Sequence, residues 1–372
     1  MEEKGTILAK PVRLASLDAL RGFDMLFIMG GEGLVCAIAA ALGFPEFKDG
    51  FGHAAWHGFH FMDVVFPLFL FMAGVSFPFS CAKSRSRGLP ERTIALKCLR
   101  RGATLVFLGL CCSKLLSLDF AHLRVWSVLG RIGVAWMVAA WLYLALGVKT
   151  RLGVAAAILA AVTAGTVFVT APGAAAPVDP FSPEGNFGCW LDRTLTGGHT
   201  YRPLFDPEGF AGMLPAVVTA MLGMFAGDIV RRGGSAATGR KALELAACGA
   251  AATALGLALS PVFPVNKALW SPSFTLVAGG VSFAAFAAFY WIVDVLEFRR
   301  WTFFFTVIGM NSITIYMAQR VIGFRVARDF LFGGVASLFP EAWGAVVLQA
   351  GYIAACWLFL YFLHRKGVYL KV

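Results

Sequence analysis

Three histidines and one aspartate stand together where a polar stretch becomes an apolar one, in GHAAWHGFHFMDVVFPLFLF (residues 52–71). They are His53, His57, His60 and Asp63. A neutral imidazole can act as a general base or as a nucleophile when a carboxylate orients it. Because a carboxylate inside a membrane helix is costly to keep, Asp63 favours a functional role over a purely structural hydrogen bond.

The spacing of these residues limits how they can meet. In one continuous helix, positions 53 and 63 would lie about 15 Å apart. A direct pair between His53 and Asp63 therefore requires the chain before Phe59 to fold back into the bundle, and Gly58 and the glycines before it permit such a turn. Three histidines and a carboxylate could alternatively hold a metal ion. Because the remaining sequence supplies no second ligand cluster, we expect no metal site.

The composition indicates the kind of element that positions these residues. The chain has 372 residues, is 59% hydrophobic and 14% charged, and has a mean hydropathy of +0.74, which is typical of polytopic membrane proteins and not of soluble domains. About 20 apolar residues are needed to cross a bilayer as a helix. We therefore predict an all-α membrane protein, one domain over residues 1–372, with an outer loop at 172–207. About ten transmembrane helices are expected, over residues 16–43, 59–81, 94–117, 124–147, 151–171, 208–231, 241–260, 273–296, 301–324 and 341–364.

The distribution of lysine and arginine predicts the orientation of these helices. Most of the 32 basic residues fall at alternate helix ends, which the positive-inside rule assigns to the cytoplasm together with both termini. The net charge of +11 is explained by this topology, so we expect no nucleic-acid partner. The loop that carries His53, the 172–207 loop and residues 261–273 should then meet on the extracytoplasmic side.

Three of the charged residues within the apolar segments are further candidates for a functional role. Glu32 follows two glycines near the outer end of the first segment, at about the depth that Asp63 should reach, so either carboxylate could orient an imidazole. Arg21 lies one turn into the same segment and can extend to the surface or pair with Asp18. Arg131, in VLGRIGV, requires an acidic partner or an anionic ligand.

The motif FDPEG (205–209) has two interpretations. Asp206 can cap a helix whose first residue is Pro207, with Glu208 in the first turn facing the helix dipole. The two carboxylates could equally bind a ligand. The sequence does not separate these interpretations.

Two amide-containing motifs follow in the second half of the chain. In NKALWSPSF (266–274), an interfacial anchor explains Lys267 and Trp270 but leaves Asn266 without a role. In GMNSITIYM, Asn311 lies inside a predicted helix, where a hydrogen bond between helices is the simplest explanation.

These motifs together resemble a known family. RLASLDALRG, HAAWHGFHFMDVVFP, FDPEG, NKALWSPSF and GMNSITIYM occur in the order found in heparan-α-glucosaminide N-acetyltransferase and its bacterial relatives, from about residue 12 to the end of the chain. The resemblance implies a multi-span enzyme of the inner membrane that carries acetyl from cytosolic acetyl-CoA to a glucosamine amine. It also implies that His53 is the catalytic histidine and Asp63 the buried aspartate of its block. The chain departs from the family at His57 and at Glu32, where the family has asparagines.

The resemblance and the residues give a first assignment of roles. The acceptor is an amino sugar or glycan, the surrounding partner is membrane lipid, and a homodimer is a candidate assembly. A secondary transporter and an O-acetyltransferase acting on a cell-envelope glycan remain alternatives. The expected catalytic residues are His53, Asp63 and Glu32; the expected substrate-binding residues are His57, Asn266, Lys267, Trp270, Asp206, Glu208 and Asn311; the expected coenzyme-binding residues are Arg21, Lys97, Arg100, Arg101 and Arg131.

Overall fold

The computed structural model describes residues 14–174, 177–233 and 237–370, which form α-helices joined by loops and short helical turns. The helices are α1 (Ala15–Leu26), α2 (Glu32–Ala41), α3 (Phe47–Phe51), α4 (Phe61–Ser86), α5 (Glu91–Cys112), α6 (Val128–Ala145), α7 (Val148–Phe168), α8 (Phe187–Leu195), α9 (Met213–Arg231), α10 (Gly239–Leu259), α11 (Pro272–Phe289), α12 (Thr302–Met310), α13 (Ser312–Val321), α14 (Phe324–Ala336) and α15 (Glu341–Arg365). The predicted all-α class is confirmed.

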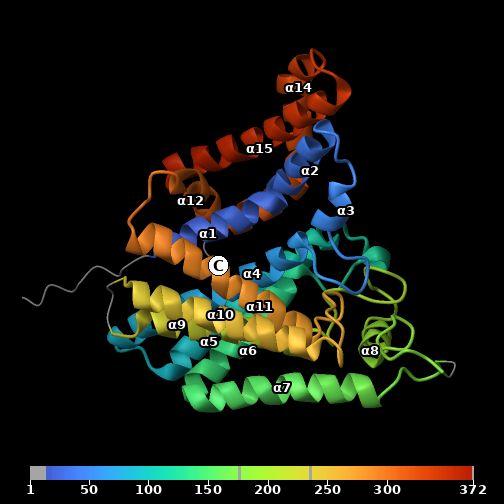
Figure 1. The fold of residues 1–372 in the computed structure, drawn as a ribbon, viewed down its shortest axis with the longest axis vertical. Helices are drawn as coiled ribbons and strands as arrows, with labels where there is room; N and C mark the ends of the chain where they lie inside the picture. The colour runs from blue at the N-terminus through green and yellow to red at the C-terminus, as the bar shows by residue number, and fades with distance from the viewer. Residues whose placement is uncertain (1–13, 175–176, 234–236, 371–372) are drawn as a thin grey trace, which may run out of the picture.

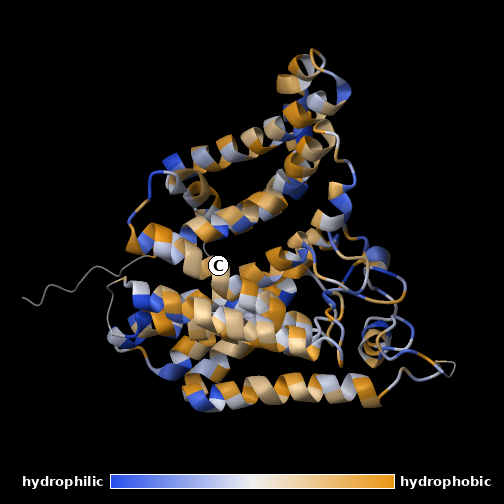
Figure 2. Ribbon diagram, viewed as in Figure 1, coloured by the Kyte–Doolittle hydropathy of each residue, from blue (hydrophilic) through white to orange (hydrophobic). Residues whose placement is uncertain are grey.

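The long helices are apolar enough to make this a polytopic membrane protein. Within the described residues, eight helical segments have the length and hydropathy to cross a membrane, where the sequence predicted about ten. The predicted segment 94–117 forms α5, which is not one of the eight because it carries the cations Lys97, Arg100 and Arg101. The predicted segment 301–324 is divided at Asn311 into two short helices, α12 and α13. Apolar residues follow the long helices, and hydrophilic residues gather near many of their ends (Figure 2).

The helices form two groups that lie side by side (Figure 1). In one group α4 packs on α9, α5 on α6 and α10 on α11; in the other, α1 packs on α12, and α15 packs on α2 and α14. Each group has its own apolar core, with Phe66 and Leu129 in the first and Met25 and Ile353 in the second.

Two helices bend where the groups meet. A π-helical turn, Phe27–Gly31, separates α1 from α2, and Gly30 within it has a φ of 119°, a conformation that glycine adopts without strain. On the facing side, Asn311 has φ −123° and ψ 24°, which ends α12 before α13 begins. These bends were not foreseen, because hydropathy gives the length of an apolar segment and not its continuity.

The close contact of α4 with α9 depends on glycine. A Cβ atom on Gly223 would lie 2.0 Å from the carbonyl oxygen of Phe71, and one on Gly74 would lie 2.2 Å from that of Ala220. Small residues let membrane helices approach closely enough for extended van der Waals contact. The contact therefore sets the position of α4, which carries Asp63.

Gly223→Ala is expected to lower the free energy of unfolding by about 1–3 kcal/mol, since the added methyl group must displace backbone atoms. Thermal unfolding in detergent measures the effect. Gly153→Ala is the control, because a Cβ atom at this exposed position of α7 meets nothing within 4 Å. Equal melting temperatures for the two variants would contradict the argument.

Candidate active site

The segment between α3 and α4 folds back over the end of the bundle. Residues 53–60 are not helical, and Gly58 has a φ of 131°, which turns the chain. The Gly58 N–H donates to the carbonyl of Val265 at 2.9 Å, and the indole of Trp56 donates to the carbonyl of Phe181 at 2.8 Å. The three loops predicted to share the outer side of the membrane thus lie together at one end of the molecule.

This fold-back brings His53 against Asp63. Nδ1 of His53 lies 2.9 Å from Oδ1 of Asp63, although the residues are ten apart in the chain. The backbone N–H groups of Ala54 and His60 donate to the other carboxylate oxygen, at 3.2 and 3.0 Å. Asp63 is fully buried in the first turn of α4, where a carboxylate also complements the helix dipole. Asp63 therefore fixes both the loop and the imidazole.

Lys267 completes this group from the opposite loop. Its Nζ lies 3.0 Å from Nδ1 of His53 and 3.5 Å from Oδ1 of Asp63. Burial lowers the pKa of Lys267, while the carboxylates of Asp63, Glu208 and Glu32 act in the opposite direction. An ammonium and a carboxylate therefore compete for the same imidazole nitrogen.

The loop that carries Lys267 is held by its own polar side chains. The Asn266 side-chain oxygen accepts the N–H of Leu269 at 2.8 Å, and the Ser271 hydroxyl accepts the N–H of Asn266 at 3.1 Å. Trp270 has a φ of 50° and donates its indole N–H to the Thr219 hydroxyl at 3.1 Å. The buried Trp270 is thus a packing residue that fixes the turn, so the interpretation of Trp270 as an interfacial anchor was wrong.

Asn266 also contacts the second histidine of the motif. Its side-chain nitrogen lies 3.3 Å from Nδ1 of His57. Burial lowers the pKa of His57, and Asp179 partly opposes this shift. The third histidine, His60, precedes α4 as its N-cap and contributes its backbone N–H to Asp63. The three histidines therefore have different surroundings, and His53 is the one whose imidazole contacts the side chains of Asp63 and Lys267.

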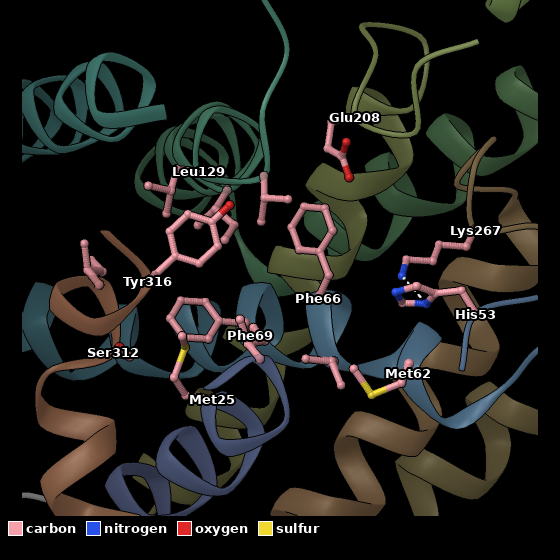
Figure 3. Close-up of a pocket in the computed structure, with 15 residues that line it drawn as sticks. Met25, His53, Met62, Phe66, Phe69, Leu129, Glu208, Lys267, Ser312 and Tyr316 are labelled. Atoms are coloured by element: carbon pink, nitrogen blue, oxygen red, sulfur yellow. Dashed lines mark hydrogen bonds between the residues drawn. The ribbon is translucent and has the colours of Figure 1, made fainter. Parts of the chain in front are cut away.

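A cavity of about 220 Å³ lies between the two helix groups, with His53 and Lys267 at one end and Tyr316 and Ser312 at the other (Figure 3). Its walls are mostly apolar and come from α1, α4, α6 and α13. Few polar groups face it, which is typical of a site that binds an organic chain and orients it at one end. The lining residues are Met25, Ile28, His53, Met62, Val65, Phe66, Phe69, Val128, Leu129, Ile132, Glu208, Lys267, Ser312, Ile313 and Tyr316.

The FDPEG motif forms an ion-pair network and not a helix start. Arg124 donates to both Asp206 and Glu208, with its Nε 2.9 Å from Asp206 Oδ2. The following helix begins at Met213, so the prediction that Asp206 caps it was wrong. The Gly209 N–H donates to the Asp206 carbonyl and the Met213 N–H donates to that of Phe210, so the chain makes two turns before the helix begins. Glu208 lines the cavity, as His53 and Lys267 do.

Arg131 supports the same loop from within α6. Its Nη2 donates to the carbonyl of Gly209 at 2.6 Å, and its guanidinium lies 4.9 Å from the centre of the Trp270 ring. Its Nε and Nη1 are buried and have no hydrogen-bond partner among the described residues, so the expected anionic partner stays a prediction. The contacts with Gly209 and Trp270 place Arg131 at the His53 end of the bundle.

The remaining coenzyme-binding candidates lie on α1 and α5. Arg21 pairs with Asp18 at 3.5 Å, which is one of the two interactions predicted for it. It also donates to the Ser76 hydroxyl at 3.2 Å. Arg101 stacks on Trp136, 4.3 Å from the ring centre. Lys97 and Arg100 are exposed on α5. These four cations are not brought into the cavity that contains His53.

Two other predicted residues lie near the cavity without lining it. Glu32 begins α2, and one of its carboxylate oxygens lies 3.7 Å from where a Cβ atom of Gly52 would be, close to the loop of His53. Asn311 is buried, and its side-chain nitrogen lies 3.5 Å from the carbonyl of Val307 in the preceding helix, α12. This contact is local and replaces the predicted bond between distant helices. Within the described residues, no group of three or more His, Cys, Asp or Glu side chains has the arrangement of a metal site.

Arg124 and the apolar wall of the cavity were not predicted from the sequence. Arg124 lies outside the motifs, in a short connection before α6, and only its contact with Asp206 identifies it. Phe66 and Phe69 lie in the apolar part of the 52–71 segment, where phenylalanines are expected to be ordinary core residues. Their three-residue spacing on α4 was the available signal, because it places both on one face of the helix.

Comparison with known proteins identifies the family. Residues 13–259 match the family described as heparan-alpha-glucosaminide N-acetyltransferase, catalytic. The chain belongs to this family. It is similar to heparan-alpha-glucosaminide N-acetyltransferase of Homo sapiens, with 26% identity over 433 residues, covering 98% of this chain and 60% of the human protein. The protein of the same name from Mus musculus is 25% identical over 429 residues, covering 97% of this chain and 60% of that protein.

These relatives set the level at which function is known. The chain spans about 60% of the length of the curated relatives it matches. The matched residues correspond to the region that the family description calls catalytic. The residues that carry the reaction are the subject of the proposal below.

Proposed function

We propose that the protein moves acetyl from cytosolic acetyl-CoA to the amine of a glucosamine-type sugar on the extracytoplasmic side of the inner membrane, with residues 1–372 acting as one domain. The observation that carries the proposal is the pair of His53 and Asp63 at the end of an apolar cavity. Family membership supplies the reaction type. The geometry supports the identity of the group that performs it.

The cavity fits the flexible arm of the donor better than it fits a sugar. Phe66, Phe69 and Leu129 give it apolar walls, which suit a chain of methylene groups and a thioester, and polar groups occur at the end near His53. The phosphates at the other end of the coenzyme need cations. Arg21, Lys97, Arg100 and Arg101 are our candidates, and Arg131 remains the fifth, although its Nη2 donates to the carbonyl of Gly209.

His53 can act in either of two ways. As a nucleophile, Nε2 attacks the thioester carbonyl, the C–S bond breaks, and the thiolate leaves; the acceptor amine then attacks the acetyl-imidazole and releases His53. As a base, Nε2 removes a proton from the acceptor ammonium; the amine then attacks the thioester carbonyl directly, the C–S bond breaks, and coenzyme A leaves as the thiolate. In both routes Nδ1–H donates to Asp63, which stabilises the positive charge that develops on the ring.

The other polar residues at this end suit the acceptor. Glu208 faces the cavity near Lys267 and could hold the acceptor ammonium close to His53. Asn266 and His57 form a hydrogen-bonded pair at the mouth, where sugar hydroxyls could exchange for their contact. Asp206 positions Glu208 through Arg124, Trp270 fixes the turn of Lys267, and Glu32 and Asn311 remain in our proposal as more distant contributors.

The proposal is tested by giving purified protein acetyl-CoA and a panel of amino sugars and hydroxylated glycans, and measuring coenzyme A release and acetylated product. We expect release that depends on an amino sugar. Release that depends only on a hydroxylated glycan would favour the O-acetyltransferase. Absence of release, with flux of the sugar across proteoliposomes, would favour the transporter.

Lys267→Met is expected to change the dependence of kcat/KM on pH. A protonated Lys267 donates to Nδ1 of His53, which leaves the proton on Nε2 and blocks its lone pair. Activity of the unmodified protein should therefore fall as the pH drops through the lowered pKa of Lys267, and this limb should be lost in the variant. Lys48→Met removes an exposed lysine of α3 and serves as the control. Identical pH profiles for all three proteins would exclude this role of Lys267.

A further inference from the structure

A second, polar chamber adjoins the apolar cavity and has no part in the proposed reaction. Two cavities of about 520 and 270 Å³ lie between α13, α14, α15 and the π-helical turn. Ile28 lines both of them and also the apolar cavity, and Tyr316 lines the larger one and the apolar cavity. The polar chamber therefore begins where the apolar cavity ends, at Tyr316.

The chamber is positively charged. Arg320, Arg325 and Arg328 line it together with Gln319 and Tyr352, and no acidic residue is among the described residues that line either cavity. Arg328 pairs with the exposed Asp329 at 2.6 Å. Three guanidinium groups around one hollow attract an anion and can bind its oxygens in pairs.

The neighbouring side chains leave the guanidinium groups of Arg320 and Arg325 accessible. The Arg320 guanidinium lies 5.8 Å from the centre of the Tyr316 ring, and the Gln319 side chain donates to the Tyr352 hydroxyl at 2.9 Å. Both Arg320 and Arg325 are exposed. Their charges are therefore available to a ligand that arrives from outside the bundle.

The helix next to this cluster is apolar on its exposed side. Val326 and Phe330 of α14 are 73% and 87% exposed, and Leu331 is 58% exposed. The other side of α14 packs on α15 (Figure 1). A helix with an exposed apolar side and arginines at its edge is typical of the boundary between lipid headgroups and acyl chains. An anion held beside this surface therefore lies next to acyl chains, which favours a lipid as its source.

We propose that the arginine chamber, formed by Arg320, Arg325 and Arg328, binds the phosphate of an acidic phospholipid, and that its acyl chains lie along Val326 and Phe330. The shared chemistry is a phosphate anion; the apolar face of α14 selects the lipid as its source. The proposal does not depend on the acyl-transfer reaction, since it is measured by binding without a donor or acceptor.

The test measures binding of fluorescent phosphatidylglycerol to the purified full chain in detergent, with phosphatidylcholine and inorganic phosphate as competitors. Arg320→Gln/Arg325→Gln should weaken binding by about tenfold or more, because each charged hydrogen bond contributes on the order of tenfold. Arg87→Gln/Arg300→Gln removes two exposed charges outside the chamber and should leave binding unchanged. Equal weakening by both pairs, or equal competition by phosphatidylcholine, would overturn the proposal.

A second pair of substitutions, on the apolar side of α14, distinguishes a lipid from a soluble phosphate. Val326→Ser/Phe330→Ser changes two exposed side chains, so the fold should be kept. We expect this pair to weaken phosphatidylglycerol binding. If it has no effect and inorganic phosphate competes as well as the lipid does, the chamber binds a soluble phosphate compound and the assignment to lipid is wrong.

Discussion

His53→Ala is expected to reduce turnover by about 10³-fold, within the range for loss of an acid–base group. His53 is the histidine that touches both Asp63 and Lys267 and lines the cavity. Its side chain is 54% exposed, so its removal should leave the fold and the melting temperature unchanged. Binding of acetyl-CoA should also be kept, because the proposed phosphate contacts lie elsewhere. The measurements are kcat, thermal unfolding and equilibrium binding.

The other two histidines of the motif are the controls for this result. His60→Ala should be mild, because the bond that His60 makes to Asp63 comes from its backbone. His57→Ala should raise KM more than it lowers kcat, since it removes a contact with Asn266 and none with His53. If all three variants lost activity equally and added zinc restored it, the site would be a metal centre.

Labelled donor without an acceptor distinguishes the two routes. If the nucleophilic route operates, acetyl label should stay on the unmodified protein and be absent from His53→Ala. If His53 is only a base, neither protein should retain label. The turnover loss is expected in both cases, so this measurement adds the mechanism to the residue assignment.

The sequence was most informative about the class of fold and the fold-back at His53. Hydropathy gave the long helices because each must match the bilayer, and the glycines before Phe59 indicated the turn that joins His53 to Asp63. Which end of the bundle faces the cytoplasm stays a prediction from the basic residues. Its test is labelling of a cysteine placed at position 53 with an impermeant reagent.

The remaining features depend on contacts between distant segments. The division at Asn311 gives α12 and α13, although 301–324 reads as one apolar segment. Asp206 and Pro207 are residues typical of a helix N-terminus, but the Asp206 carboxylate instead pairs with Arg124, 82 residues away in the chain. Such long-range partners leave no local pattern, so the ion-pair network could not be derived from the sequence.

Asp63→Asn is expected to reduce turnover by about 10²- to 10⁴-fold with little change in size or shape. The carboxylate accepts from His53, Ala54 and His60, whereas an amide offers one oxygen and two donors. The amide N–H₂ would donate to Nδ1 and leave the proton on Nε2, the nitrogen that must react. Because Asp63 also holds the start of α4, the melting temperature should fall, and kcat must be measured on protein that remains folded.

A charge-neutralising role for Asp63 makes a different prediction, because Lys267 lies 3.5 Å from the same carboxylate. If Asp63 served only to compensate that ammonium, Lys267→Met would restore activity to Asp63→Asn. If Asp63 acts on the imidazole, the double variant should stay about as inactive as Asp63→Asn, since the amide still holds Nδ1 in the wrong state. A double-mutant cycle on kcat therefore separates the two roles. Recovery of most of the lost activity in the double variant would make Asp63 a partner of Lys267 and remove it from the catalytic pair.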